Sequence, residues 1–302
     1  MNGQRSGIVA FTIGMGLALS LGAQVTAPDA KVEKLAGDFG FTEGPTSDKD
    51  GNVYFVDQNN DKILKYDTDG KLTTFMEHTG RSNGMTFNSK GELIACADEK
   101  NEMWSIDVKT KEHKVILKDF EGKYFNGPND VWEQPGTGRL YFSDPYYHRT
   151  WWKRGDRDPS EGPQGVYFLQ PSDAKIVRVA DDLQQANGII GTPDGKKLYV
   201  ADIRGRQTYS YDINPDGTLA NKQPFCASGS DGMTIDSEGN LYLSSGRAVH
   251  VYDKTGKSIQ EIPVPEAPAN MCFGGKDMKT LFITARTGFY SIKMNVKGAG
   301  AQ

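Results

Sequence analysis

Six short motifs along the chain each place one carboxylate or amide side chain just before an apolar run. They read F-T-E-G-P, R-S-N-G-M, G-P-N-D-V, Q-A-N-G-I, S-D-G-M-T and P-A-N-M-C, and their polar residues are Glu43, Asn83, Asn129, Asn187, Asp231 and Asn270. Two carboxylates among amides suit a hard cation, Ca²⁺ first and Mg²⁺ or Mn²⁺ next, better than a structural zinc site. Taken alone, each Asn-Gly or Asp-Gly pair is more typical of a turn.

These six residues, called the polar ring below, recur at similar intervals. Subtracting successive residue numbers gives 40, 46, 58, 44 and 39. Strand-like cores such as N-V-Y-F-V-D, R-L-Y-F-S-D and K-L-Y-V-A-D recur with them, and most are followed by another short strand. The pattern predicts an all-β fold, a six-bladed β-propeller of four-stranded antiparallel blades around a channel. An open β-sandwich is the alternative.

The end of the chain predicts how the propeller closes. After Asn270 only about three strands' length of chain remains, so the segment Val32–Leu35 is expected to complete the last blade and remove an exposed edge. If each ring residue begins the innermost strand of its blade, all six lie at one end of the channel and Glu43 faces Asn187 across the axis. Polar side chains converging there need water, a ligand or a cation.

Composition and the N-terminal segment limit the classes of protein to which the chain can belong. The chain has 302 residues, 37% hydrophobic and 25% charged, with a formal net charge of −4, and no basic excess that would indicate nucleic-acid binding. Arg5 precedes an apolar run from Gly7 to about Ala23, which predicts a signal peptide over residues 1–23 and one propeller domain over 24–302. The expected location is periplasmic or secreted, without membrane association after cleavage; an uncleaved anchor is the alternative.

Cysteine and histidine usage argues against a soft-metal site. Cys96, Cys226 and Cys272 are widely spaced in apolar settings, which predicts buried free thiols, with one disulfide and one free thiol as the alternative. The four histidines share no metal-type spacing. No glycine-rich loop falls between a strand and a helix, so no organic cofactor is expected.

Taken together, these motifs resemble those of a known family, the SMP-30/gluconolactonase/LRE-like proteins, which are six-bladed propellers that bind a divalent metal. The resemblance covers nearly all of the chain after the signal region. It implies that Glu43, Asn187 and Asp231 are metal ligands and that Asn129 is a ligand or a substrate contact. Asn83 joins the candidate substrate contacts through the repeat. The resemblance rests on F-T-E-G-P at 41–45, N-G-P-N-D-V at 126–131, G-R-L-Y-F-S-D-P at 138–145, Q-G-V-Y at 164–167, A-N-G-I at 186–189 and S-D-G-M at 230–233.

Within the family the bacterial gluconolactonases look closest, which implies metal-dependent hydrolysis of a small sugar lactone. The ion, Ca²⁺ or otherwise Mg²⁺, Mn²⁺ or Zn²⁺, would polarise the lactone carbonyl, and Asp231 is the candidate general base. Direct activation of water by the metal, or Asp231 as nucleophile, stays open. Alternatives are a metal-dependent aryl-ester or phosphotriester hydrolase and a non-catalytic ligand-binding propeller. The sequence does not predict an oligomeric state.

The longest interval, from Asn129 to Asn187, contains an insertion rich in aromatic and basic residues, Y-Y-H-R-T-W-W-K-R-G-D-R-D-P-S-E-G-P from residue 146. Beside the channel mouth it would form a wall or lid, with Tyr146, His148 and Trp151 as candidate substrate contacts. A packed surface loop is the alternative. Two arginines that follow inner-strand cores, Arg247 and Arg286, are candidates for the rim of the channel.

Overall fold

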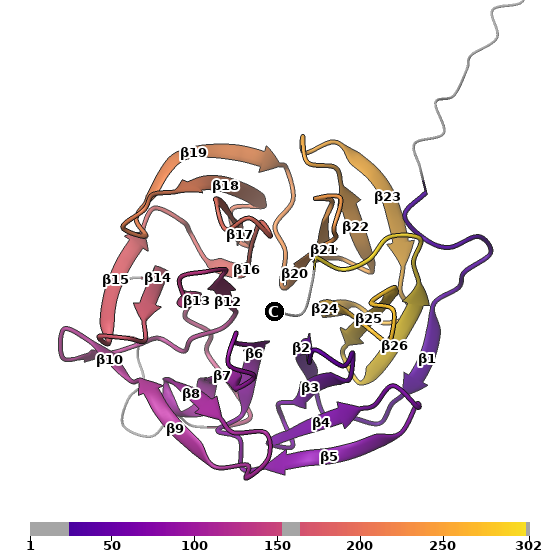
Figure 1. The fold of residues 1–302 in the computed structure, drawn as a ribbon, viewed down its shortest axis with the longest axis horizontal. Coiled ribbons are helices and arrows are strands. Elements are labelled where there is room, and N and C mark those ends of the chain that lie inside the picture. The colour runs from indigo at the N-terminus through magenta and orange to yellow at the C-terminus, as the bar shows by residue number, and fades with distance from the viewer. Residues whose placement is uncertain (1–23, 153–163, 300–302) are drawn as a thin grey trace, which may run out of the picture.

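The computed structural model describes residues 24–152 and 164–299, and these form six four-stranded antiparallel sheets around a central channel (Figure 1). In each sheet the first strand lies beside the channel and the fourth lies on the outside. The predicted six-bladed β-propeller is therefore confirmed, and the β-sandwich is not the fold.

The blades follow one another in chain order, and their strands are short. The first three blades contain β2 (Thr42–Ser47), β3 (Val53–Asp57), β4 (Lys62–Tyr66) and β5 (Leu72–Glu77); β6 (Ser82–Phe87), β7 (Leu93–Ala97), β8 (Glu102–Ile106) and β9 (His113–Leu117); and β12 (Val131–Gln134), β13 (Arg139–Asp144), β14 (Gly165–Gln170) and β15 (Lys175–Ala180). The last three contain β16 (Ala186–Gly191), β17 (Lys197–Asp202), β18 (Gln207–Ile213) and β19 (Leu219–Cys226); β20 (Met233–Ile235), β21 (Leu241–Ser245), β22 (Ala248–Tyr252) and β23 (Ser258–Pro263); and β24 (Pro268–Gly274), β25 (Thr280–Ala285), β26 (Gly288–Lys293) and β1 (Glu33–Ala36).

Two minor elements lie outside the blades. A small hairpin pairs β10 (Asp119–Phe120) with β11 (Lys123–Tyr124), and the short helix η1 (Asp98–Lys100) follows β7. In the described part of the chain η1 is the one helical element.

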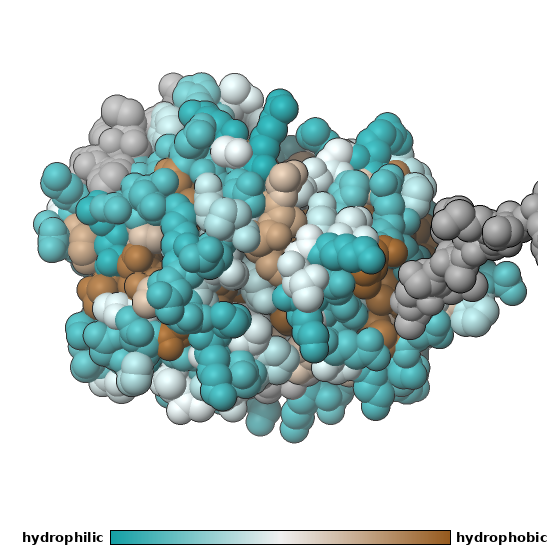
Figure 2. Space-filling view, turned by 90° about the horizontal axis from the view of Figure 1, so that it is seen from above, coloured by the Kyte–Doolittle hydropathy of each residue, from teal (hydrophilic) through white to brown (hydrophobic). Residues whose placement is uncertain are grey.

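The hydrophobic core lies between neighbouring blades. All five residues of β3 and of β7 are buried, because these strands have a neighbour on each side and a blade against each face. Tyr54 on β3, for example, meets Phe87 of the next blade edge-on, with ring centroids 5.2 Å apart. The side of the propeller that Figure 2 shows edge-on is mostly hydrophilic.

An N-terminal strand closes the ring, as the sequence predicts. Strand β1 pairs antiparallel with β26, with Glu33 opposite Ser291, so the closing strand is shifted by one residue from the predicted Val32–Leu35. The preceding segment is also attached, since the Ala27 N–H donates to the Lys293 carbonyl at 3.0 Å. Strand β26 therefore has a strand partner on each side, and β1 forms the outer edge of the last blade.

Three further expectations concern the termini and the cysteines. Residues 1–23, where a signal peptide is predicted, lie outside the described residues, so that prediction is untested. Within the described residues no helix is long and apolar enough to cross a membrane. Cys96, Cys226 and Cys272 are all buried and free, as expected.

Glycines that follow ring residues allow neighbouring inner strands to approach closely. A Cβ atom on Gly84 would overlap the Asn129 carbonyl and the Asp130 carboxylate, and one on Gly232 would overlap the Asn270 amide. The Gly84 N–H also donates to the Asn129 carbonyl at 2.7 Å. The Asn-Gly and Asp-Gly pairs of the ring therefore set the width of the channel, whereas their composition alone would indicate turns.

We expect Gly84→Ala to destabilise the protein by about 2–3 kcal/mol, because the new methyl group overlaps backbone that cannot move aside easily. The control is Gly91→Ala, where no atom lies within 4 Å and only the positive φ of 77° opposes a side chain, at about 1 kcal/mol. Denaturant unfolding of both variants measures the difference. Equal effects would show that the channel tolerates widening.

Candidate functional site

The polar ring lies at one end of the channel. Glu43, Asn83 and Asn187 are the second residues of β2, β6 and β16. Asn270 is the third residue of β24, whereas Asn129 and Asp231 each lie two residues before an inner strand rather than on it. Because the blades follow in order, Glu43 in the first blade and Asn187 in the fourth stand on opposite sides of the channel, as predicted.

A repeated carboxylate holds the chain where it enters several inner strands. The last residue of the second strand is Asp57 in the first blade, Asp144 in the third and Asp202 in the fourth. The carboxylates of these residues accept hydrogen bonds of 2.9–3.2 Å from backbone N–H groups at positions 40–41, 126–127 and 184–185. These bonds fix the segments that lead to ring residues.

A cavity of about 400 Å³ opens above the ring. Four ring residues line it, namely Glu43, Asn83, Asn129 and Asp231. Its walls carry aromatic and cationic side chains, among them Tyr147, Arg149, Trp151 and Arg286. The volume is in the range of small-molecule sites, and the lining combines aromatic side chains with a few polar groups, as in sites that orient a ligand.

The amide of Asn187 is held in one orientation. Its Nδ2 donates to the Tyr147 hydroxyl at 2.6 Å and to Asp231 Oδ1 at 2.8 Å. Both amide hydrogens are therefore used, while Asn187 Oδ1 is buried and has no hydrogen-bond donor; Asn83 Oδ1 is in the same situation. A buried carbonyl oxygen without a partner is costly, so both oxygens are suited to a cation or a donor in the channel.

Burial and mutual repulsion perturb the carboxylates of the channel. Burial, followed by the negative charges of Asp231 and Asp130, raises the pKa of Glu43 well above its usual range. Burial also raises the pKa of Asp231, opposed by the hydrogen bond from Asn187 and by the charges of Arg149 and Arg286. Ionised carboxylates here lack enough positive partners.

Asp130 is a third carboxylate in the channel that the sequence analysis missed. Burial and the charge of Asp231 raise its pKa well above its usual range, and Asn270 Nδ2 donates to its two oxygens at 3.1 and 3.3 Å. Both residues line a second cavity of about 140 Å³, formed by the inner strands beyond the ring. The sequence signal that could have identified Asp130 is its position directly after Asn129 in G-P-N-D-V.

The donor set fits a hard cation. No three His, Cys, Asp or Glu side chains of the described residues are grouped so as to hold a metal by themselves. The carboxylates of Glu43 and Asp231, joined by amide oxygens such as Asn187 Oδ1, provide oxygen donors and excess negative charge. Oxygen-rich sets of this kind are typical of Ca²⁺ and Mg²⁺ sites.

The described part of the insertion forms one wall of the cavity, but not through all the expected residues. Tyr147, Arg149 and Trp151 line the cavity. Tyr146 and His148 do not, and His148 is exposed. Successive side chains of an extended segment point to opposite sides, so alternate residues reach the cavity. The geometry therefore assigns Tyr147 and Arg149 the places expected for Tyr146 and His148.

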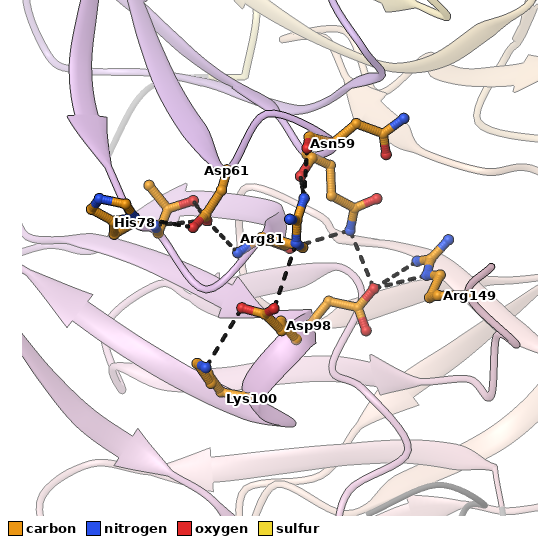
Figure 3. Close-up of polar contacts among 10 residues, drawn as sticks. Asn59, Asp61, His78, Arg81, Asp98, Lys100 and Arg149 are labelled. Carbon is orange, nitrogen blue, oxygen red and sulfur yellow. Dashed lines mark hydrogen bonds and ion pairs between the residues drawn. The ribbon is translucent and has the colours of Figure 1, made fainter. Parts of the chain in front are cut away.

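A buried ion pair anchors this wall to the second blade (Figure 3). Arg149 donates to Asp98 Oδ2 from Nε at 2.9 Å and lies 2.8 Å from it through a terminal nitrogen. Gln58 donates to the same oxygen at 3.2 Å. The Arg81 guanidinium lies over the Trp152 ring, 5.2 Å from its centroid. Charge-assisted bonds in a buried setting hold the backbone of Tyr147 and Trp151 in place.

The two arginines proposed for the rim differ in position. Arg286 is exposed and lines the cavity. Arg247 does not line it, and its guanidinium donates to the Pro265 carbonyl.

Comparisons with known proteins agree with this architecture. A family model described as SMP-30/Gluconolactonase/LRE-like region matches residues 41–287. The gluconolactonase of Zymomonas mobilis is 29% identical over 297 residues, covering 88% of this chain and 82% of that protein. A solved structure proposed to be a gluconolactonase is 31% identical, with a TM-score of 0.85, and the match covers 91% of this chain and 96% of that one. The gluconolactonase of Xanthomonas campestris, 24% identical with a TM-score of 0.82, shares the fold over 89% of this chain and 91% of its own. The chain belongs to the SMP-30/gluconolactonase/LRE-like family.

Proposed function

We propose that the protein hydrolyses a sugar lactone with the help of a divalent cation held by the polar ring. The chain is a lactonase-class enzyme by its family and by its similarity to a gluconolactonase. The observation that carries the proposal is the cavity floor. There, buried carboxylates and unpartnered amide oxygens lie below a space of about 400 Å³. We further propose that residues 1–23 direct export to the periplasm or beyond.

The residues that would hold the cation are Glu43, Asn187, Asp231 and Asn129. Ca²⁺ suits this set of oxygen donors best, with Mg²⁺, Mn²⁺ or Zn²⁺ as alternatives. Bound there, the cation would act as a Lewis acid that polarises the lactone carbonyl and stabilises negative charge on its oxygen. Tyr147 helps because its hydroxyl accepts one Asn187 amide hydrogen and leaves Oδ1 available.

The protein side chains would bind the lactone and move the proton. The face of Trp151 would contact the sugar ring, while the amides of Asn83 and Asn129 would donate hydrogen bonds to its oxygens. Asp231 would take a proton from water as the water oxygen attacks the carbonyl carbon. When the ring C–O bond breaks, Asp231 would return that proton to the departing alkoxide. Burial raises the pKa of Asp231 in the metal-free protein, whereas the positive charge of a bound cation would lower it again.

We expect Asp231→Asn to lower kcat on glucono-1,5-lactone at least about 100-fold, because the amide cannot accept the proton. Acid release by residues 24–302 would be followed above the spontaneous rate, after chelation and after adding back each cation. The control, Asp50→Asn, removes a carboxylate from an exposed turn and should keep full activity. Full turnover by Asp231→Asn would exclude its role. Turnover of aryl esters or phosphotriesters in place of lactones would redirect the substrate assignment.

The raised pKa values predict how the metal-free protein responds to pH. The carboxyls of Glu43, Asp130 and Asp231 bind protons more tightly in the folded protein than in the unfolded chain. Above the unfolded pKa of about 4, the folded state binds more protons, so stability falls as pH rises through the folded pKa values.

We therefore expect the Tm of chelated protein to decrease between about pH 5 and pH 8, and Ca²⁺ to raise Tm most at the high end, where it binds ionised carboxylates. Glu43→Gln should reduce the decrease because it removes one of the groups. Scanning fluorimetry across this range measures all three samples. A slope unchanged in Glu43→Gln would contradict the assignment.

A further inference from the structure

We propose that Arg286 selects lactones that carry a second acidic group, a carboxylate or a phosphate, away from the lactone carbonyl. The inference rests on the proposed function and narrows its substrate class. It is drawn from the backbone conformation, the fixed position and the charge of this residue.

Arg286 has a backbone conformation that disfavours a side chain. It begins the two-residue hairpin between β25 and β26, and its φ is 48°. The matching hairpin of the fifth blade, between β21 and β22, has Gly246 at this position, with φ 62°. Glycine is the usual residue at positive φ, and non-glycine residues there often mark functional positions. The hairpin itself therefore does not require an arginine.

Hydrogen bonds fix the Arg286 backbone beside the ring. Its carbonyl accepts from the Thr42 N–H at 2.8 Å and from the Thr42 hydroxyl at 3.3 Å. Thr42 directly precedes Glu43 on β2. On the other side, the Glu266 carboxylate accepts from the N–H and the hydroxyl of Thr287 at 3.0 and 2.9 Å. The Arg286 side chain thus starts from a fixed point at the edge of the cavity.

The described residues leave the charge of Arg286 without a compensating carboxylate. The other cationic side chain in its wall, Arg149, is paired with Asp98. A divalent cation would balance the carboxylates of Glu43 and Asp231. Among the described residues no carboxylate lies within ion-pair distance of Arg286, although its charge does act on Asp231. Asp130 lies deeper, lines the second cavity and is bonded by Asn270.

An acidic substituent on the substrate would supply the missing charge. A guanidinium binds a carboxylate or a phosphate through two parallel hydrogen bonds, which fixes the orientation of the ligand as well as its charge. With the lactone carbonyl over Glu43 and Asp231, an acidic substituent that projects toward the edge of the cavity would meet Arg286. A neutral aldonolactone would leave the guanidinium facing water.

The test compares three lactones on cation-loaded protein: glucono-1,5-lactone, which is neutral, glucaro-1,4-lactone, which carries a carboxylate, and 6-phosphoglucono-1,5-lactone, which carries a phosphate. We expect kcat/KM to be at least about tenfold higher for one acidic lactone than for the neutral one. The better of the two acidic substrates then shows whether the site prefers a carboxylate or a phosphate. Arg286→Gln should lower kcat/KM on that lactone about tenfold more than on the neutral one. Arg247→Gln, which removes an arginine outside the cavity, should keep the preference.

A second variant separates binding from folding. Arg286→Gly introduces the residue type that the fifth-blade hairpin has at the matching position. The Tm of this variant should equal or exceed that of the wild type, while the preference for the acidic lactone is lost. Equal kcat/KM on all three lactones in the wild type, or a preference that survives Arg286→Gln, would overturn the proposal.

If no lactone is hydrolysed, the proposed function fails, and the inference is then decided by calorimetry with the open acids. Tighter binding of glucarate or 6-phosphogluconate than of gluconate, lost in Arg286→Gln, would support the selection by Arg286. Equal binding of the three acids would refute it.

Discussion

Repulsion among buried carboxylates at the centre of the propeller is the constraint on which the rest of the structure depends. Glu43, Asp130 and Asp231 come from three different blades and share one channel, where burial raises the pKa of all three, and the negative charge of Asp231 further raises those of Glu43 and Asp130. Left ionised and uncompensated, such a cluster opposes folding. A bound cation would turn the same groups into a favourable site, which would couple the stability of the ring to its chemistry.

The blades resist that repulsion by close packing and repeated hydrogen bonds. Glycines such as Gly84 and Gly232 let one inner strand lie directly against the next, so the ring cannot narrow further. Aspartates at the ends of second strands, such as Asp57 and Asp202, hold the segments that enter the inner strands. The second blade departs from this pattern. There, Asp61 of the first blade accepts the N–H groups of Thr79 and Arg81, and Asp98 instead binds the arginine of the insertion.

The period of the sequence predicted the fold because each repeat contributes one blade and the blades must be arranged in order. It also predicted which end of the channel is polar and which strand closes the ring. It did not predict Asp130, because the repeat identifies one position per blade and the extra carboxylate belongs to a single blade. The insertion has no repeat against which to set its phase, so the sequence did not separate Tyr147 and Arg149, which line the cavity, from Tyr146 and His148, which do not. The positive φ of Arg286 depends on a hairpin shape that the residues T-A-R-T do not reveal.

The most direct test of this account is isothermal titration of Ca²⁺ into chelated protein near pH 6, repeated in buffers of different ionisation enthalpy to count protons released. We predict one cation bound per chain with net release of protons, because the pKa values of Glu43, Asp130 and Asp231 are raised in the metal-free protein and the cation binds the ionised carboxylates. Absence of binding by Ca²⁺, Mg²⁺, Mn²⁺ and Zn²⁺, or binding without proton release, would contradict it.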